Sequence, residues 1–153
     1  MKKSLLFIMA FFSIFSYAQF PEGFEGATFP PAGWVVEDNG VGTAQSWGIT
    51  TATGFGWVHQ GARSAMVNRD NGATSTGLAQ DWLITPQVNI PANGQIRFYA
   101  RSRSNGEQGS IYKVMLSTTT QNRAAFTTTL ATYTELEIQN LPFEQFNILL
   151  NGG

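Results

Sequence analysis

The sequence contains no cysteine and a single histidine, and both shortages limit the chemistry that the chain can carry. Without cysteine no disulfide can stabilise the domain, and a zinc site built from the usual cysteine and histidine ligands is excluded. Charged residues make up only 12% of the chain and the formal net charge is −1, so there is no basic footprint for nucleic acid. We therefore expect no nucleic-acid partner.

Long apolar runs are also missing, apart from one at the N-terminus. Lys2 and Lys3 precede an apolar stretch at 5–15, and the small residues Ser16 and Ala18 stand where a signal peptidase recognises its substrate. The stretch is shorter than the roughly 20 residues that a membrane-spanning helix needs. These features predict a signal peptide at 1–18, a secreted or cell-surface location, and no transmembrane segment in the mature chain.

The remaining residues, 19–153, are enough for one domain with a packed core. Gly, Thr, Asn, Gln and Ser are plentiful, which suits strands joined by polar turns better than helices. Alternation with a period of two is clearest at 95–102, where Ile96, Phe98 and Ala100 share one face. The same alternation recurs at 111–119 and at 143–150.

Further short strands are expected between turn residues, and together they define the fold class. We expect them at 34–37, 46–51, 56–67 and 82–90, with a short helical turn at 122–126 and extended chain after it. Short strands at regular spacing predict an all-β sandwich or barrel.

Motifs that would indicate catalysis are not found. There is no Gly-x-Ser-x-Gly elbow for a serine hydrolase and no glycine-rich phosphate loop followed by a lysine and a helix. The Asp and Glu residues show no pattern typical of a glycosidase pair. We expect the protein not to be an enzyme, and a hydrolase is the alternative that the sequence leaves open.

Calcium is the metal that the sequence could hold. The stretch "EDNG" at 37–40 offers Asp38 together with amide and backbone oxygens, the hard ligands that Ca²⁺ prefers, and Glu25 could add a carboxylate if its segment lies alongside. The alternative is that Asn39 and Gly40 simply form a tight turn. Glu25 and Asp38 are therefore the candidate ligands for a structural calcium, and "NRDNG" at 68–72 is a second, weaker candidate.

Four tryptophans, at 34, 47, 57 and 82, can serve either as core residues or as stacking faces for sugars. Trp57 has glycines at 54 and 56 beside it, and we expect it to be the most exposed of the four. The polar loop at 68–81 is long, and loops of that kind often carry function. The candidate ligand-binding residues are Trp57, His59, Asp70 and Asn71.

Six motifs in a fixed order resemble the cleaved-adhesin, or choice-of-anchor J, domain family over about residues 24–150. They are "FEGATFPPAGW" (24–34), "DNGVGTAQSW" (38–47), "GARSAMV" (61–67), "DWLITPQVNIP" (81–91), "IRFYARS" (96–102) and "YKVMLSTT" (112–119). The motif "DWLITP" is the most specific of the six.

The resemblance implies a galactose-binding-like jelly-roll β-sandwich, often with a structural calcium, in secreted or surface proteins of Bacteroidetes-type bacteria. It implies adhesion to an extracellular protein or glycan of a host, export by the type IX secretion system, and in some cases a role as an accessory domain of a larger secreted peptidase or glycosidase. Other domains of a longer parent protein are then possible partners.

Two departures from the family pattern affect these expectations. The acid-rich loop that the family has before its second tryptophan keeps only Asp38 here, with Asn39 and Val41 at potential ligand positions. The aromatic-rich closing strand of the family would follow "FEQFNILLNGG" and is not in the sequence. We therefore expect the sandwich of 19–153 to be incomplete at its C-terminal end.

Overall fold

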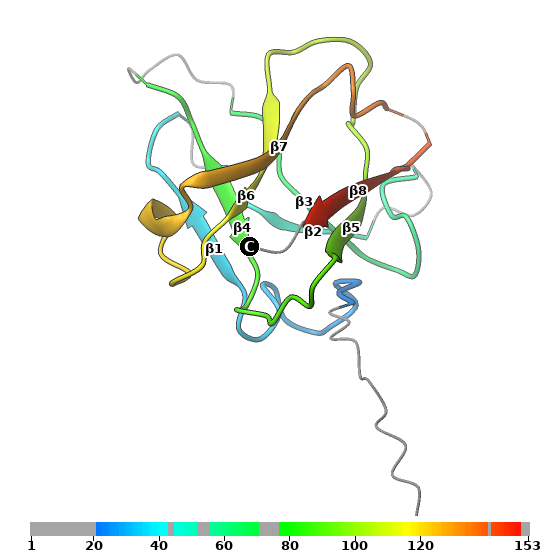
Figure 1. Ribbon diagram of the computed structural model, residues 1–153. Coiled ribbons are helices and arrows are strands. Elements are labelled where there is room, and N and C mark those ends of the chain that lie inside the picture. The colour runs from blue at the N-terminus through cyan, green and yellow to red at the C-terminus, as the bar shows by residue number, and fades with distance from the viewer. Residues whose placement is uncertain (1–20, 43–44, 52–55, 71–76, 141, 151–153) are drawn as a thin grey trace, which may run out of the picture.

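The computed structural model describes residues 21–42, 45–51, 56–70, 77–140 and 142–150 (Figure 1). The predicted signal peptide and Asn71 lie outside these residues. The described chain is all-β, as predicted, with eight strands and one 3-10 helix, η2 (Arg123–Ala125). The strands are β1 (Val35–Asp38), β2 (Gly48–Thr50), β3 (Ser64–Met66), β4 (Asp81–Ile84), β5 (Gly94–Ala100), β6 (Ile111–Leu116), β7 (Thr128–Thr134) and β8 (Glu144–Leu150).

The strands form four antiparallel pairs, β1–β4, β2–β3, β5–β8 and β6–β7. Most strands lie where the sequence predicts them, but the strand expected at 82–90 ends at Ile84, and of the two strand pieces expected at 56–67 only β3 forms while 56–63 is loop. Pro86 explains the early end, because proline has no N–H to donate to a ladder and restricts the residue before it. No helix in the described part of the chain is long and apolar enough to span a membrane.

The β6–β7 pair packs face to face on the β5–β8 pair, and aromatic rings fill the space between these two layers. Phe98 of β5 stacks on its register partner Phe146 of β8, with 5.2 Å between ring centroids. Tyr133 of β7 meets Phe146 edge-on at 4.8 Å, and Tyr112 of β6 lies 5.8 Å from Phe98. Burial, with a smaller contribution from Tyr133, raises the pKa of Tyr112 to about 12. Facing sheets with a shared aromatic core agree with the predicted sandwich.

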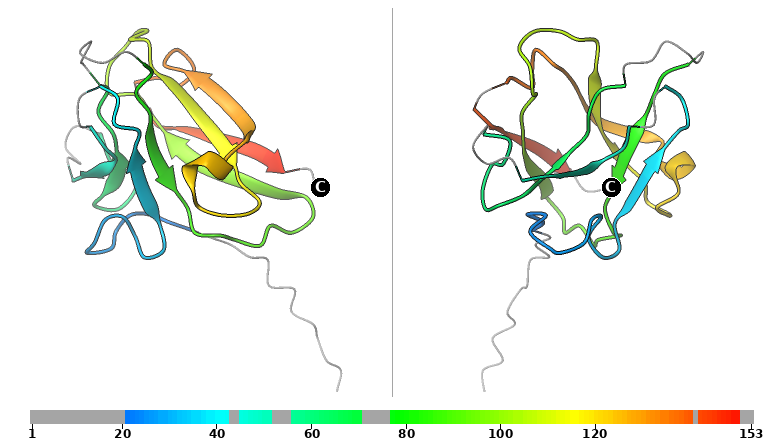
Figure 2. Two further views of the ribbon diagram at one scale, coloured as in Figure 1. Left: turned by 90° about the vertical axis from the view of Figure 1, so that its left-hand side faces the viewer. Right: turned by 180° about the vertical axis from the view of Figure 1, so that it is seen from behind.

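A second group of apolar contacts lies around the β1–β4 pair, which Figures 1 and 2 show on the opposite side of the molecule from β5 and β8. Phe24 meets Trp34 edge-on at 5.4 Å, and Trp82 of β4 lies 5.8 Å from Phe126. Ile84, at the end of β4, is only 3% exposed. The entry segment is therefore held to the sandwich by ring packing.

The alternation predicted for β5 and β8 is confirmed, and it leaves a polar outer face. Ile148 is buried, whereas Arg97, Tyr99 and their register partners point outward. Arg97 Nε donates to Asn147 Oδ1 at 3.2 Å, and the Tyr99 hydroxyl lies 2.6 Å from Gln145 Oε1. These cross-strand contacts hold Tyr99 in place at the end of β5 that leads into the candidate site.

Candidate functional site

Three loops meet at one end of the sandwich: residues 56–61, residues 101–110 after β5, and residues 135–140 with 142–143 after β7. Arg101 joins them, because its Nη1 donates to the Gly56 carbonyl at 2.7 Å and its Nη2 donates to Asn140 Oδ1 at 3.1 Å. Burial lowers the pKa of the Arg101 guanidinium from its usual value, and the group stays charged. We call this region the loop end.

Local hydrogen bonds give the third of these loops its shape. Glu137 Oε2 accepts from the backbone N–H and the hydroxyl of Thr134, at 2.8 and 3.0 Å, and the N–H groups of Glu137 and Ile138 return to the Thr134 carbonyl. Ile138 is only 8% exposed and anchors the loop in the core. Ser102 N–H donates to the Gln139 carbonyl at 3.0 Å and joins the second loop to the third.

An aromatic patch lies on the loop end, formed by the rings of Trp57, His59, Tyr99 and Phe143 with two arginines. The His59 ring stacks on Tyr99 with 3.9 Å between centroids, and its edge meets Phe143 at 5.3 Å. The guanidinium carbons of Arg101 and Arg103 lie 5.9 Å from the Phe143 centroid and 4.8 Å from the Trp57 centroid. His59 and Tyr99 are exposed, so the patch offers ring surface to a partner.

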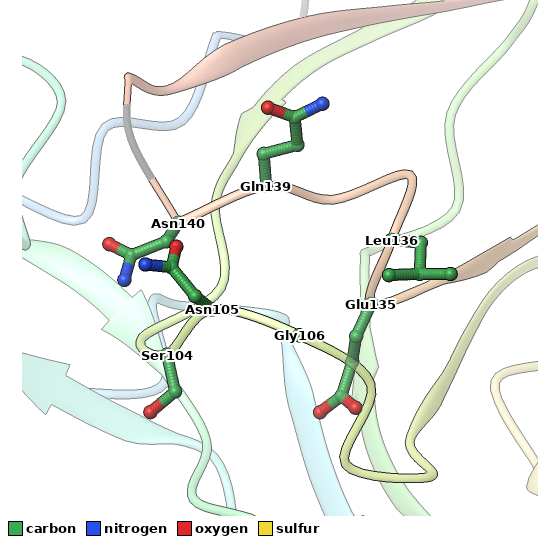
Figure 3. A pocket seen from close by; sticks show the side chains of 7 residues that line it. All are labelled: Ser104, Asn105, Gly106, Glu135, Leu136, Gln139 and Asn140. Atoms are coloured by element: carbon green, nitrogen blue, oxygen red, sulfur yellow. The ribbon is translucent and has the colours of Figure 1, made fainter.

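A polar pocket of about 240 Å³ lies beside the aromatic patch (Figure 3). Ser104, Asn105 and Asn140 stand on one side and Glu135 and Leu136 on the other. Asn140 also contacts Arg101, so the pocket and the patch share a border. The full lining is Ser104, Asn105, Gly106, Glu135, Leu136, Gln139 and Asn140.

The structure brings two of the four sequence-predicted ligand-binding residues together at this end. Trp57 and His59 both belong to the aromatic patch, whereas Asp70 lies beside Gly42 and Ala79, away from the patch. Sequence reasoning missed Tyr99, Phe143 and the pocket. The alternation of β5 places Tyr99 on its exposed face, and an aromatic residue at such a position could have been recognised from the sequence as a candidate binding residue.

Asp70 belongs instead to a group of three carboxylates with Asp38 and Asp81. Asp38 and Asp81 are register partners at the ends of β1 and β4. Burial, followed by the charges of Asp70 and Asp38, raises the pKa of Asp81 to about 6. Asp81 Oδ1 is buried and accepts no hydrogen bond from the described residues. The group is therefore an electrostatically unfavourable arrangement at neutral pH.

Glu25 makes contacts of a different kind. Its Oε1 and Oε2 each lie 3.1 Å from the backbone N–H of Ala62, and Oε1 also accepts from the N–H of Arg63 at 3.0 Å. The Arg63 guanidinium donates to the Gly26 carbonyl and reinforces the contact. Glu25 thus caps the turn before β3 as an acceptor of peptide hydrogen bonds.

These contacts bear on the calcium expected at Glu25 and Asp38. The Glu25 carboxylate already accepts hydrogen bonds from peptide N–H groups, whose partial positive charge would repel a cation bound at the same oxygens. Asn39 Oδ1 is likewise occupied, because it accepts from the N–H groups of Val41 and Gln80. In the described chain no three His, Cys, Asp or Glu side chains are placed to hold a metal ion. A site shared by Glu25 and Asp38 does not fit this geometry. Asp38, Asp70 and Asp81 carry oxygens of the kind that Ca²⁺ prefers, but their side chains are not placed as metal ligands in this structure.

Comparison with known proteins adds one match. The family model named Cleaved Adhesin Domain matches residues 18–144. No curated protein and no solved structure matches the chain. The matched segment contains β1 to β7, the first residue of β8 and the loop end. The chain therefore belongs to the cleaved-adhesin family and is an adhesion-related module.

Proposed function

We propose that the chain is a non-enzymatic adhesion module that binds an extracellular protein or glycan through its loop end. The observation that carries this proposal is the aromatic patch, together with membership of an adhesin family. An adhesive contact needs ring surface that a partner can cover and polar groups that set its orientation. The patch supplies the first and the pocket beside it supplies the second.

The patch suits this role because its rings are already ordered. His59 is held between Tyr99 and Phe143, and Tyr99 is held by Gln145. Side chains that are fixed before binding lose little conformational entropy when a partner covers them. The arginine–aromatic pairs add positive charge at the rim, which favours partners with carboxylate or other acceptor groups there.

A structural calcium ion is a separate part of the proposal: binding would draw together Asp38, Asp70 and Asp81, which are not placed as ligands in this structure, rather than recruit Glu25. A divalent cation there would neutralise the repulsion that raises the pKa of Asp81. The ion would stabilise the contact between β1, β4 and the chain at Asp70 without taking part in ligand chemistry. Isothermal titration with CaCl₂ tests it, because Asp81→Asn and Asp38→Asn should both abolish the binding heat.

The adhesion proposal is tested by binding of the purified chain to immobilised extracellular-matrix proteins and to a glycan array. We expect binding to at least one surface, and loss of that binding when His59 and Phe143 are both changed to Ala. Leu149→Ala is the matched control, because Leu149 is 69% exposed and lies at the other end of β8. Equal loss in the control, or no binding by the unaltered chain, would contradict the proposal.

Enzymatic activity is measured in parallel on the same protein. We expect no hydrolysis of casein or of a mixed polysaccharide by the chain at concentrations that saturate adhesion. Reproducible turnover that co-purifies with the folded chain and is lost on unfolding would overturn the non-enzymatic assignment.

A further inference from the structure

Three asparagines in the described chain stand directly before a glycine: Asn39, Asn93 and Asn105. Asn71 and Asn151 do so as well, and both lie outside the described residues. In such a pair the backbone nitrogen of the glycine can attack the side-chain amide carbon, since glycine has no Cβ to block the approach. The attack requires an amide that is free to rotate and a glycine N–H that no acceptor holds. The fold therefore decides which pair reacts.

The pair at Asn39 is held at both of these groups. Its Nδ2 donates to the Leu78 carbonyl at 2.8 Å, and its Oδ1 accepts from two backbone N–H groups. The N–H of Gly40 donates to Asp38 Oδ1. The amide cannot turn toward the Gly40 nitrogen unless several hydrogen bonds break first.

The pair at Asn93 has an occupied nitrogen in crowded surroundings. The Gly94 N–H donates to the Pro91 carbonyl at 2.9 Å and closes the turn before β5. Gly94 is also the first residue of β5 and pairs with Leu150. A Cβ on Gly94 would clash with the Ile90 side chain, so there is little room for a ring to form on this nitrogen.

The pair at Asn105 has neither restraint. Asn105 and Gly106 are exposed in the second loop of the loop end. Among the described residues, the Asn105 side chain and the Gly106 N–H have no hydrogen-bond partner. Gly106 has a φ of +81°, and a Cβ built there would meet no atom within 4 Å. The two reacting groups are therefore free at this pair.

We propose that Asn105 is a site of spontaneous deamidation. The Gly106 nitrogen bonds to Asn105 Cγ while the Cγ–Nδ2 bond breaks, and Nδ2 leaves as ammonia with the proton that the Gly106 N–H gives up. Water then opens the succinimide ring at either carbonyl and yields an aspartyl or an isoaspartyl residue. Water is the only reactant consumed, and nothing is oxidised or reduced.

The products change the loop end in charge and in shape. A carboxylate at position 105 replaces a neutral amide beside a pocket that Glu135 also lines (Figure 3). Glu135 accepts from the Gln108 N–H, so the new repulsion acts on a contact between the second and third loops. The isoaspartyl form also lengthens the main chain by its β-carbon. The reaction itself does not depend on the adhesion proposal, although it alters the surface that we assign to adhesion.

Peptide mapping by mass spectrometry tests the proposal on the purified chain after incubation at neutral pH. Trypsin cleaves after Arg103 and Lys113, so Asn105 is measured apart from the other Asn-Gly pairs. We expect Asn105 to deamidate at least about tenfold faster than Asn39 or Asn93, because hydrogen bonds must break before either of those can react. Isoaspartate should be among the products at Asn105.

Two comparisons separate the effect of the fold from that of the local sequence. In urea the bonds that protect Asn39 and Asn93 are lost, so the rates at the three pairs should converge. Gly106→Ala should slow the reaction at Asn105 alone, because a Cβ hinders the attack while the space around it is open. Gly109→Ala is the matched control: Gly109 lies in the same loop with a φ of +89° and equally open space, and the rate at Asn105 should not change.

Three results would overturn the proposal. The first is reaction at Asn39 or Asn93 as fast as at Asn105 in the folded chain. The second is a rate at Asn105 that Gly106→Ala leaves unchanged. The third is aspartate without isoaspartate, which would indicate direct hydrolysis of the amide instead of ring closure. The same order of rates in urea as in the folded chain would overturn the structural cause, because the local sequence would then set the order.

Discussion

The His59 ring lies nearly parallel to the Tyr99 ring, with 3.9 Å between their centroids and 16° between their planes. The two residues are 40 positions apart in the chain, one in the loop before β3 and the other at the end of β5. Phe143, from the loop before β8, completes the contact against the edge of His59. A single exposed imidazole thus fixes one loop against two other segments.

Replacing His59 with Ala should loosen the loop at 56–61 and reduce adhesion together. An aromatic pair contributes roughly 0.5–1.5 kcal/mol beyond burial, so we expect about 1 kcal/mol less stability towards unfolding. Thermal denaturation measures the stability, and hydrogen exchange at 56–61 measures the local effect. His59→Phe keeps a ring at this position and should retain most of both properties. Equal behaviour of the Ala and Phe variants would show that the stack does not order the loop.

Replacing Arg101 with Lys should separate charge from geometry at the loop end. Lysine keeps the positive charge, but it lacks the planar guanidinium whose two nitrogens donate to the Gly56 carbonyl and to Asn140 Oδ1 at the same time. We expect a loss of about 1–2 kcal/mol in unfolding free energy, because at least one contact of the three-loop junction is lost. Chemical denaturation measures it. Arg97→Lys on the outer face of β5 is the control, and it should cost clearly less.

The fold could be predicted from the sequence because its strands alternate. Ile96, Phe98 and Ala100 face inward in β5 as the period of two requires, and Phe146 and Ile148 do the same in β8. The end of β4 could not be predicted as well, because the apolar run continues past Pro86 although the ladder stops before it. Apolar pattern indicates burial, but a proline decides where hydrogen bonding ends.

The candidate site was only partly predictable, for a different reason. Trp57 and His59 attract notice by their residue type, whereas Asn105, Gln139 and Asn140 are ordinary polar residues in two separate turns. Only the pairing of β5 with β8 and of β6 with β7 brings these turns together, and the sequence does not specify that pairing. Asp38, Asp70 and Asp81 likewise become one group through the β1–β4 register.

The raised pKa of Asp81 predicts a pH dependence of stability in metal-free buffer. Its pKa is 3.8 in the unfolded chain and about 6 in the folded chain, so the folded state holds the proton more tightly. The stabilising effect of the protonated group is therefore complete below pH 3.8 and is lost as the pH rises through about 6. Solvent screening of this partly exposed group limits the expected loss to about 1 kcal/mol.

Asp81→Asn isolates that contribution, because the amide stays neutral at every pH. With EDTA present, we expect the variant to gain about 1 kcal/mol over the unaltered chain at pH 7 and to match it near pH 3.5. Denaturation with urea at each pH measures the unfolding free energy of both proteins. Subtracting one from the other removes most of the contribution of other titrating groups, which both proteins share. A constant difference from pH 3.5 to pH 7 would contradict the electrostatic origin.

Glu25 provides the test that distinguishes a cap from a calcium ligand. As a cap it accepts backbone hydrogen bonds from Ala62 and Arg63, so Glu25→Ala should destabilise the chain by about 1–2 kcal/mol whether or not calcium is present. Gly61→Ala should act through the same contact, because its Cβ would lie 2.4 Å from Glu25 Oε1 and its φ of +80° suits only glycine well.

The calcium dependence of these two variants then decides between the roles. If Glu25 is a cap, the rise in melting temperature that CaCl₂ produces should be the same in Glu25→Ala as in the unaltered chain, while Asp81→Asn should abolish it. If Glu25 is a ligand, Glu25→Ala should remove the calcium effect and lose little stability in EDTA. Gly61→Ala serves as the control, since it disturbs the turn without removing a carboxylate, and its calcium response should persist because the three aspartates remain.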